Sequence, residues 1–289
     1  MAPDTSRPPR TDSRDLAELR ALRETQPALA PAIDLQIDLV ELQRRLRARV
    51  PTPVAPIAKA SVGERLKAGH RLLELVELSF EWSDFRLALR QNADILRRHD
   101  SLDASDHAAI VGLARETDSL VALVSTWYAE TAVSPRERAT HTAARQDRPA
   151  MLDQVLQLAI RPFLARAAEV AAQGAPLDVW GRPWCPYCGA DPEFAVVIAD
   201  DVRLLTCGRC EGRWPWHFVG CAWCETRDTA QLVTLASPDR KYRVYACNIC
   251  RRYLKGYDAR GGRRPVIPAV DTIATLPLDA AAQQRGYAE

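Results

Sequence analysis

The sequence predicts an α+β protein in which an all-α N-terminal region precedes two tandem β-hairpin units, each carrying four cysteines. Three observations support this fold class. Apolar residues recur at helical spacing, without any cysteine, as far as about residue 178. Beyond Trp180, short runs of β-forming residues replace that pattern. All eight cysteines of the 289-residue chain lie in this second part and form four Cys-x-x-Cys pairs.

The N-terminal region divides into a polar start and a helical domain. Residues 1–12 contain three prolines and mixed charge, so we predict a disordered N-terminus there. Residues 13–178 are predicted to form the helical domain. A proline-rich segment at 50–56 ends its first clear helix. That helix carries leucines at helical spacing: Leu35, Leu39, Leu42 and Leu46.

Further helices follow the proline-rich segment. Amphipathic patterns predict helices over 61–78 and 83–98. The next begins with Ser105 as its N-cap and continues through Val124, and Pro149 opens a last one. About six helices of this kind predict a domain of the bundle type, which could serve as a docking scaffold.

The cysteine-containing part, residues 179–262, is predicted to contain two hairpins that alternate with the cysteine pairs. The runs 194–198 and 202–205 are separated by a turn-like triplet, and the runs 232–235 and 242–245 by a second turn. A hairpin returns the chain to its starting end, so it brings the pair before it close to the pair after it. We expect the remaining residues to form a C-terminal tail that packs on these ribbons, over 263–289.

The cysteines are predicted to hold two metal ions. Because two intervening residues let both sulfurs of a pair face one ion, two pairs complete a tetrahedron. The tandem arrangement, which the hairpins favour, places Cys185, Cys188, Cys207 and Cys210 around one ion and Cys221, Cys224, Cys247 and Cys250 around the other. An interleaved arrangement, first pair with third and second with fourth, remains open. Four thiolates suit zinc in a ribbon and also iron in a rubredoxin-like site, so the metal and its redox activity remain open.

The local sequence of the pairs differs. In Cys185-Pro-Tyr-Cys188-Gly, Pro186 fixes φ and Gly189 accepts a positive φ after the second ligand. The third and fourth pairs lack a following glycine, so a weaker local fit is expected there. Thiol–disulfide exchange is the rival use of such pairs. It needs one exposed cysteine of low pKa, and four repeated pairs fit metal ligands better.

Charge argues against a nucleic-acid partner. The whole chain carries a formal charge of only +2. Residues 179–289 hold 15 basic and 12 acidic residues, and eight thiolates with two divalent ions turn this +3 into −1. Phosphate binding would therefore lack its usual electrostatic source. A local basic cluster is favoured as a solvated loop face over a binding patch; it comprises Arg251, Arg252, Lys255, Arg260, Arg263 and Arg264.

Neither export nor catalysis is predicted. The polar N-terminus is not a secretory signal, and no apolar run reaches the length of about 18 residues that suggests a membrane span. We therefore expect a cytoplasmic protein with no membrane partner, whose thiols bind metal rather than form disulfides. No G-x-S-x-G, H-E-x-x-H or other catalytic constellation is found, so the chain is not expected to be an enzyme. His217 is expected to lie at the surface or behind a ligand.

Four segments carry a resemblance to a known family. They are Trp184-Cys-Pro-Tyr-Cys-Gly-Ala-Asp-Pro192, Leu205-Thr-Cys-Gly-Arg-Cys-Glu-Gly-Arg-Trp214 running on to Cys221-Ala-Trp-Cys224, Tyr245-Ala-Cys-Asn-Ile-Cys250, and the tail Asp271-Thr-Ile-Ala-Thr-Leu-Pro-Leu-Asp279. With these motifs the chain resembles the formate dehydrogenase accessory proteins, the FdhE family. The resemblance covers residues 180–289 and extends more loosely to the pattern from Leu22 to Leu46.

The resemblance implies a cytoplasmic, non-catalytic maturation factor, a chaperone for a metalloenzyme. Such a factor binds the catalytic (alpha) subunit of a respiratory formate dehydrogenase and supports its assembly or activation. The resemblance also implies that all eight cysteines are ligands in a rubredoxin-like region, with iron as the expected metal and zinc as the alternative. A zinc-ribbon module that binds nucleic acid or transcription machinery is the rival function. The oligomeric state and the identity of the client dehydrogenase are left open.

Overall fold

The computed structural model describes residues 13–51, 59–78, 81–131, 151–198, 202–217, 219–260 and 264–288. The predicted disordered N-terminus and Pro149 lie outside these residues. The described helices are α1 (Arg14–Thr25), α2 (Ala30–Arg47), α3 (Lys59–Lys67), α4 (Trp82–Arg98), α5 (Ala104–Leu113), α6 (Thr117–Thr131), α8 (Leu152–Ala171), α9 (Pro268–Ala274) and α10 (Leu276–Gln284). The strands are β1 (Pro192–Val197), β2 (Arg203–Cys207), β3 (Arg213–Trp216), β4 (Leu232–Ala236), β5 (Tyr242–Cys247) and β6 (Tyr253–Asp258). The predicted α+β class is confirmed.

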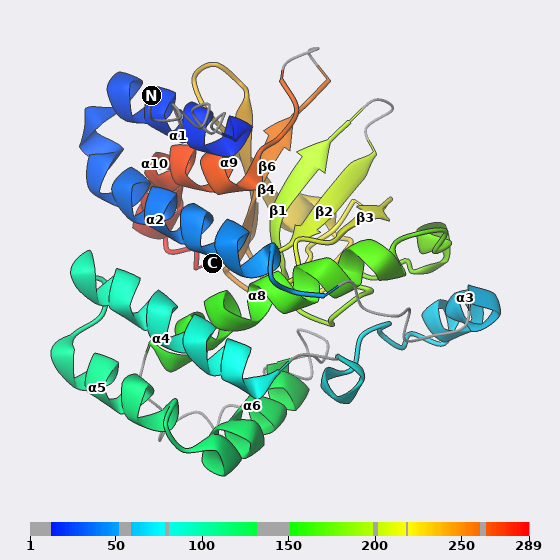
Figure 1. Ribbon diagram of the computed structural model, residues 1–289. Coiled ribbons are helices and arrows are strands. Elements are labelled where there is room, and N and C mark those ends of the chain that lie inside the picture. The colour runs from blue at the N-terminus through cyan, green and yellow to red at the C-terminus, as the bar shows by residue number, and fades with distance from the viewer. Residues whose placement is uncertain are drawn as a thin grey trace, which may run out of the picture.

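Helix α8 lies between the sheet and the group formed by α4, α5 and α6 (Figure 1). The predicted leucine stripe falls on α2, where Leu39, Leu42 and Leu46 are buried and Leu35 is partly buried. Helix α4 begins one residue before the predicted range 83–98 and ends with it. Helical periodicity therefore located these two elements well, because each buries one continuous apolar face.

The prediction of one long helix over 61–78 is wrong. Helix α3 ends at Lys67, and Gly69 follows with φ of +81°. The chain then runs alongside the first cysteine pair, where the Leu72 N–H donates to the Pro186 carbonyl at 2.9 Å and the Leu73 N–H to the Tyr187 carbonyl at 2.8 Å. Both leucines are buried, so their spacing reflects packing against this distant turn rather than a helical face.

The predicted helix that starts at Ser105 is also corrected. Its N-cap is Asp103, whose carboxylate accepts the Asp106 N–H at 2.8 Å. Ser105 lies inside the first turn and donates its hydroxyl to Asp103 at 2.8 Å. The segment then divides into α5 and α6 rather than continuing to Val124 as one helix. Aspartate competes with serine as an N-cap on equal terms, so sequence preference alone did not separate them.

Both predicted hairpins are present, and they join into one sheet. The six strands follow the order β3-β2-β1-β6-β5-β4. Neighbours are antiparallel except at the centre, where β1 pairs with β6 in parallel, with Phe194 opposite Lys255 and Val197 opposite Asp258. Each ribbon gains a third strand after its second cysteine pair, β3 in the first and β6 in the second.

The largest buried core crosses from the helices into the first ribbon. It joins α2, α4, α6 and α8 to Cys185, Tyr187 and Trp214. A smaller core lies between α1, α2 and α9, around Leu19 and Val270. The helical part and the first ribbon are thus held by the same apolar burial, which dominates the stability of such folds.

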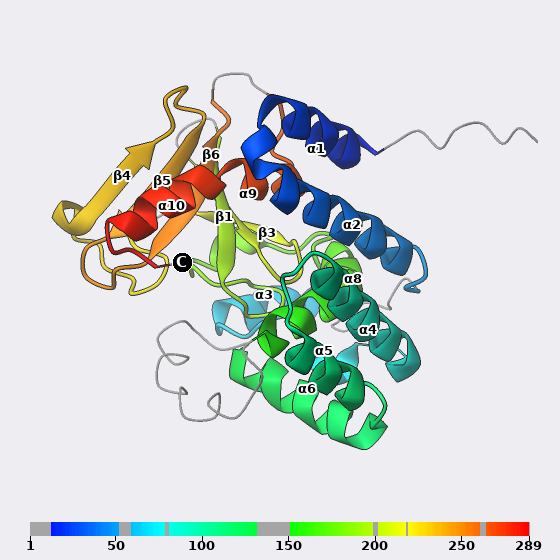
Figure 2. The same cartoon turned by 90° about the vertical axis from the view of Figure 1, so that its left-hand side faces the viewer.

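The C-terminal residues form α9 and α10, which connect the sheet to the N-terminal helices. Helix α9 packs against α1 and α2, and α10 covers β5 (Figure 2). Two fully or nearly buried carboxylates fix this arrangement. Asp271 accepts the Tyr242 hydroxyl at 2.6 Å and Arg264 at 2.7 Å, while Asp279 accepts the Tyr253 hydroxyl and the Lys255 ammonium, both at 2.8 Å. These aspartates are the first and last residues of the tail motif.

Among the helices of the described residues, none combines the length and the apolar character that a bilayer span requires.

Candidate metal centres

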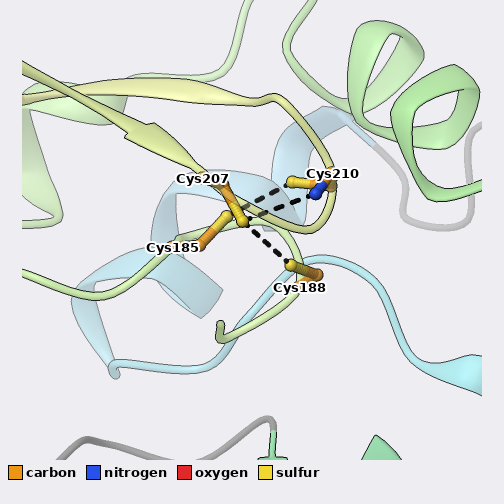
Figure 3. A group of neighbouring side chains, drawn as sticks. All are labelled: Cys185, Cys188, Cys207 and Cys210. Carbon is orange, nitrogen blue, oxygen red and sulfur yellow. Dashed lines mark hydrogen bonds between the residues drawn. The ribbon is translucent and has the colours of Figure 1, made fainter. Parts of the chain in front are cut away.

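The structure gathers the eight cysteines into two groups of four. The first group contains Cys185, Cys188, Cys207 and Cys210, and the second contains Cys221, Cys224, Cys247 and Cys250. Within each group the sulfurs all lie within 4.8 Å of one another. Figure 3 shows the first group, with the four side chains converging from the two knuckles. The tandem grouping is therefore the one that the fold brings together.

The sulfur positions fit a tetrahedral metal ion. In the first group Cys185 and Cys210 lie 3.5 Å apart and so do Cys188 and Cys207. In the second group the corresponding separations are 3.5 Å and 3.7 Å. A metal–sulfur bond of about 2.3 Å gives a tetrahedral edge of about 3.8 Å, whereas a disulfide requires about 2.05 Å. The eight thiols thus have the spacing of two closed thiolate sites and not of disulfides.

All four Cys-x-x-Cys turns have the same backbone hydrogen bonds. The first cysteine of each pair accepts, at 3.0–3.2 Å, an N–H from the residue four positions later. That residue has φ between +58° and +76° in every turn. It is Gly189, Glu211, Glu225 and Arg251 in chain order. The weaker fit expected from the missing glycines is therefore not seen in the backbone, although a non-glycine residue there costs about 1 kcal/mol.

The first group is enclosed by the helical part of the chain. Its four cysteines are at most 1% exposed. The Gly208 carbonyl, between Cys207 and Cys210, accepts the Gln157 side-chain amide at 3.1 Å and the Arg161 guanidinium at 2.5 Å, both from α8. On the other side, residues 72–73 bond to the first knuckle as described above. Helix α8 and the non-helical residues 72–73 therefore hold the two knuckles of this group.

A buried arginine balances the charge of the first group. Arg209 is 3% exposed, and its guanidinium stacks over the rings of Trp127 at 4.7 Å and Tyr128 at 5.6 Å. Four thiolates around a divalent ion carry a net charge of −2, which is costly to bury. The Arg209 charge offsets part of that cost, and the aromatic faces stabilise the cation.

Burial also controls the protonation of these thiols without metal. It raises the pKa of Cys185 and Cys210 well above the ordinary thiol value. Burial acts the same way on Cys188, but hydrogen bonds from its three neighbours and the Arg209 charge lower the pKa of Cys188 well below that value. Metal ligation by Cys185 and Cys210 requires the loss of their protons, so protons and metal compete for these two sulfurs.

The second group lies closer to the surface. Cys221 and Cys247 are buried, Cys250 is partly buried and Cys224 is exposed. Trp223 closes one side, since its indole N–H donates to the Tyr253 carbonyl at 3.2 Å and its ring carries the Arg252 guanidinium at 3.6 Å. Burial raises the pKa of Cys221.

Among the described members of the basic cluster, Arg251 and Arg260 are exposed as expected of a solvated face, whereas Lys255 and Arg264 are used in internal ion pairs. Lys255 is 5% exposed and pairs with Asp279. Arg264 pairs with Asp271, and Arg260 with Asp258 at 2.6 Å. Arg252 stacks on Trp223 as described, and Arg251 donates to the Arg285 carbonyl at 2.5 Å. Arg263 lies outside the described residues, and His217, directly after β3, is exposed.

Sequence reasoning missed the residues that enclose the first group. Arg209 was one arginine among many, and Gln157 and Arg161 looked like polar residues on a helix. The available sequence signal for Arg209 was its position, a basic residue between the two cysteines of a Cys-x-x-Cys pair. The contacts of residues 72–73 join positions more than 110 residues apart, and no local pattern announces them.

Comparisons with known proteins agree with the cysteine motifs. No family model matches the chain. It is 33% identical over 108 residues to a protein FdhE homolog of Erwinia tasmaniensis, covering 37% of this chain and 35% of that protein. It is 32% identical over 111 residues to protein FdhE of Escherichia coli O127:H6, with 37% and 35% covered, and 28% identical over 137 residues to an FdhE homolog of Actinobacillus pleuropneumoniae serotype 3, with 46% and 44% covered. The matches thus span about a third to under half of these relatives.

The fold matches over a longer range. The crystal structure of the FdhE protein from Pseudomonas aeruginosa superposes with a TM-score of 0.65, covering 95% of this chain and 92% of that one at 21% sequence identity. At this identity the likeness concerns the fold alone. The sequence matches and the structural match thus both point to FdhE proteins as what this chain is similar to.

Proposed function

We propose that this FdhE-family protein is a cytoplasmic, non-catalytic accessory factor that binds the catalytic subunit of a respiratory formate dehydrogenase and supports its assembly or activation. The observation that carries the proposal is the pair of four-cysteine sites, built from four turns with the same backbone hydrogen bonds and carrying the cysteine motifs that resemble the FdhE family. Sites of this kind position a metal and have no open coordination position for a substrate, unlike catalytic zinc sites.

In this proposal the eight cysteines hold two metal ions, with iron as the expected metal. When bound, an iron ion in a tetrathiolate site supplies one-electron chemistry, whereas zinc supplies only structure. The chain itself provides the rest. Arg209 lowers the cost of burying the negatively charged first site, and Gln157 and Arg161 fix the second of its knuckles against α8. The helical part then provides the surface for the client.

Affinity purification of the tagged chain from its own host, grown under formate respiration, tests the client. Enrichment of a formate dehydrogenase catalytic subunit in mass spectrometry is the expected result. Enrichment of RNA or transcription proteins instead would contradict the proposal and favour the zinc-ribbon module. The use of Lys255 and Arg264 in internal ion pairs leaves that module without much of its basic cluster.

The role of the first site is tested in the same experiment. A Cys185→Ser/Cys188→Ser variant that still captures the client but fails to activate it would indicate a redox or metal-dependent role. Loss of capture together with activation would indicate a structural role. Metal analysis of the anaerobically purified chain, with its visible absorption spectrum, distinguishes iron from zinc.

A further inference from the structure

The two four-cysteine groups share one backbone plan but differ in their access to solvent. In the first group every cysteine is at most 1% exposed. In the second, Cys221 and Cys247 are similarly buried, while Cys224 is exposed and Cys250 is only partly buried. Each pair on the second ribbon therefore contributes one inner and one outer sulfur.

The cause of the difference is visible at equivalent positions of the two ribbons. Arg209, between Cys207 and Cys210, is 3% exposed because it inserts between the helices and the first site. Ile249, at the same position between Cys247 and Cys250, is 56% exposed.

Around the second group, the described residues present two exposed apolar side chains to solvent, beside the one side that Trp223 and Arg252 cover. Val219, two residues before Cys221, is 65% exposed, and Ile249 lies on the other knuckle. Among the described residues, helix α10 packs on β5, and Cys224 and Cys250 remain at least partly exposed. An incoming ligand reaches Cys224 or Cys250 directly, whereas access to the first group requires separation of α8 and residues 72–73 from the knuckles.

We propose that the second four-cysteine group is an exchangeable metal site, open through Cys224 and Cys250 to a thiol ligand from outside the chain, while the first group retains its ion. In the exchange, a metal–sulfur bond to the incoming thiolate forms as the bond to Cys224 breaks. The proton released by the incoming thiol passes to the freed cysteine, and no oxidation state changes. Soft thiolates are the class of ligand that such ions accept. The inference rests on the proposed metal occupancy of both groups and not on the identity of the client.

The full chain, loaded with two zinc ions per molecule, provides the test. Metal content is measured first, and the chromogenic chelator 4-(2-pyridylazo)resorcinol is then added in excess at neutral pH without denaturant. We expect two phases of equal amplitude whose rates differ by about 100-fold or more, because the slow phase requires local opening of the helix–ribbon interface. Added glutathione should accelerate the fast phase in proportion to its concentration and leave the slow phase unchanged.

Alkylation identifies the site that each phase represents. Iodoacetamide added with the chelator should label Cys224 and Cys250 during the fast phase, as read by mass spectrometry, and the first group only during the slow phase. A Cys224→Ser variant should lose the fast phase and keep the slow one, and it serves as the matched control because Cys224 lies outside the buried core.

Each other outcome overturns the proposal. Release of both ions in one phase, or labelling of Cys185 or Cys210 first, would show that enclosure does not control exchange. A chain that binds fewer than two ions would remove the proposed metal occupancy itself. That result is seen in the initial metal analysis and is therefore distinct from single-phase release.

Discussion

Replacing Asp271 with alanine is expected to lower the free energy of unfolding by about 3–5 kcal/mol, because it removes the closer of the two carboxylates beside a largely buried arginine and leaves only Glu18 at 3.7 Å. Asp271 is fully buried. It accepts the Arg264 guanidinium at 2.7 and 3.2 Å, the Ile267 N–H at 2.7 Å and the Tyr242 hydroxyl at 2.6 Å. The Arg264 side chain is only 20% exposed, so water cannot replace the lost carboxylate fully.

Because Asp271 has three partners, further variants can show how much each contact contributes to the loss of unfolding free energy. Asp271→Asn keeps the shape and can still accept the Ile267 N–H, so we expect a smaller loss, about 1.5–3 kcal/mol. Tyr242→Phe removes one hydrogen bond and should cost about 1 kcal/mol. The double variant, Asp271→Ala with Tyr242→Phe, should lose less unfolding free energy than the sum of the two single variants, because both substitutions remove the same hydrogen bond.

Urea unfolding of the metal-loaded chain, followed by tryptophan fluorescence, measures these differences. Hydrogen exchange of peptides from 264–288 provides a local measure of the same network. A loss below about 1 kcal/mol for Asp271→Ala, with unchanged exchange in the tail, would refute the reasoning that this carboxylate anchors α9 to the sheet.

Three further predictions concern the turns and a buried tyrosine. Gly212→Ala would place a Cβ 2.4 Å from the Tyr187 ring, so it should weaken metal binding at the first site. The control, Gly112→Ala, meets no atom within 4 Å on helix α5, so it should raise the free energy of thermal unfolding by up to about 1 kcal/mol. Glu225→Gly removes the penalty of a non-glycine residue at positive φ, so it should raise the free energy of unfolding by about 1 kcal/mol, seen as a higher urea midpoint. An unchanged or lower midpoint would contradict this reasoning. Burial raises the pKa of Tyr242, so its contribution to stability is complete below its unfolded pKa of about 10 and is lost as the pH rises further; a pH series of urea titrations should show this decline, and Tyr242→Phe should reduce it.

The cysteine pattern and the two hairpins could be predicted because their signals are local. Pairs at a fixed spacing and strands bounded by turns need no knowledge of distant residues, and the hairpins then bring the tandem pairs together. The long stripe on α2 was found for the same reason.

Features that depend on distant partners could not be predicted. Leu72 and Leu73 looked helical, but their backbone bonds to the first knuckle instead. Lys255 looked like part of a surface cluster until β6 placed it opposite Asp279 of α10. Glu225 at positive φ contradicts local preference, and the hydrogen bonds of the turn outweigh that preference. In each case tertiary contacts override a local rule.

The strand order has a consequence for growth of the sheet. In the order β3-β2-β1-β6-β5-β4, the strands of the second ribbon repeat those of the first in the same sequence. The two ribbons are therefore related by translation and not by a two-fold rotation, and the contact between them is not symmetric. Such head-to-tail packing leaves two unlike edges. The β3 edge carries Pro215, which lacks an N–H for a further strand, whereas β4 has neither proline nor charge among Leu232–Ala236. Recruitment of another chain by strand addition, including unwanted aggregation, is therefore directed to the β4 side of the molecule.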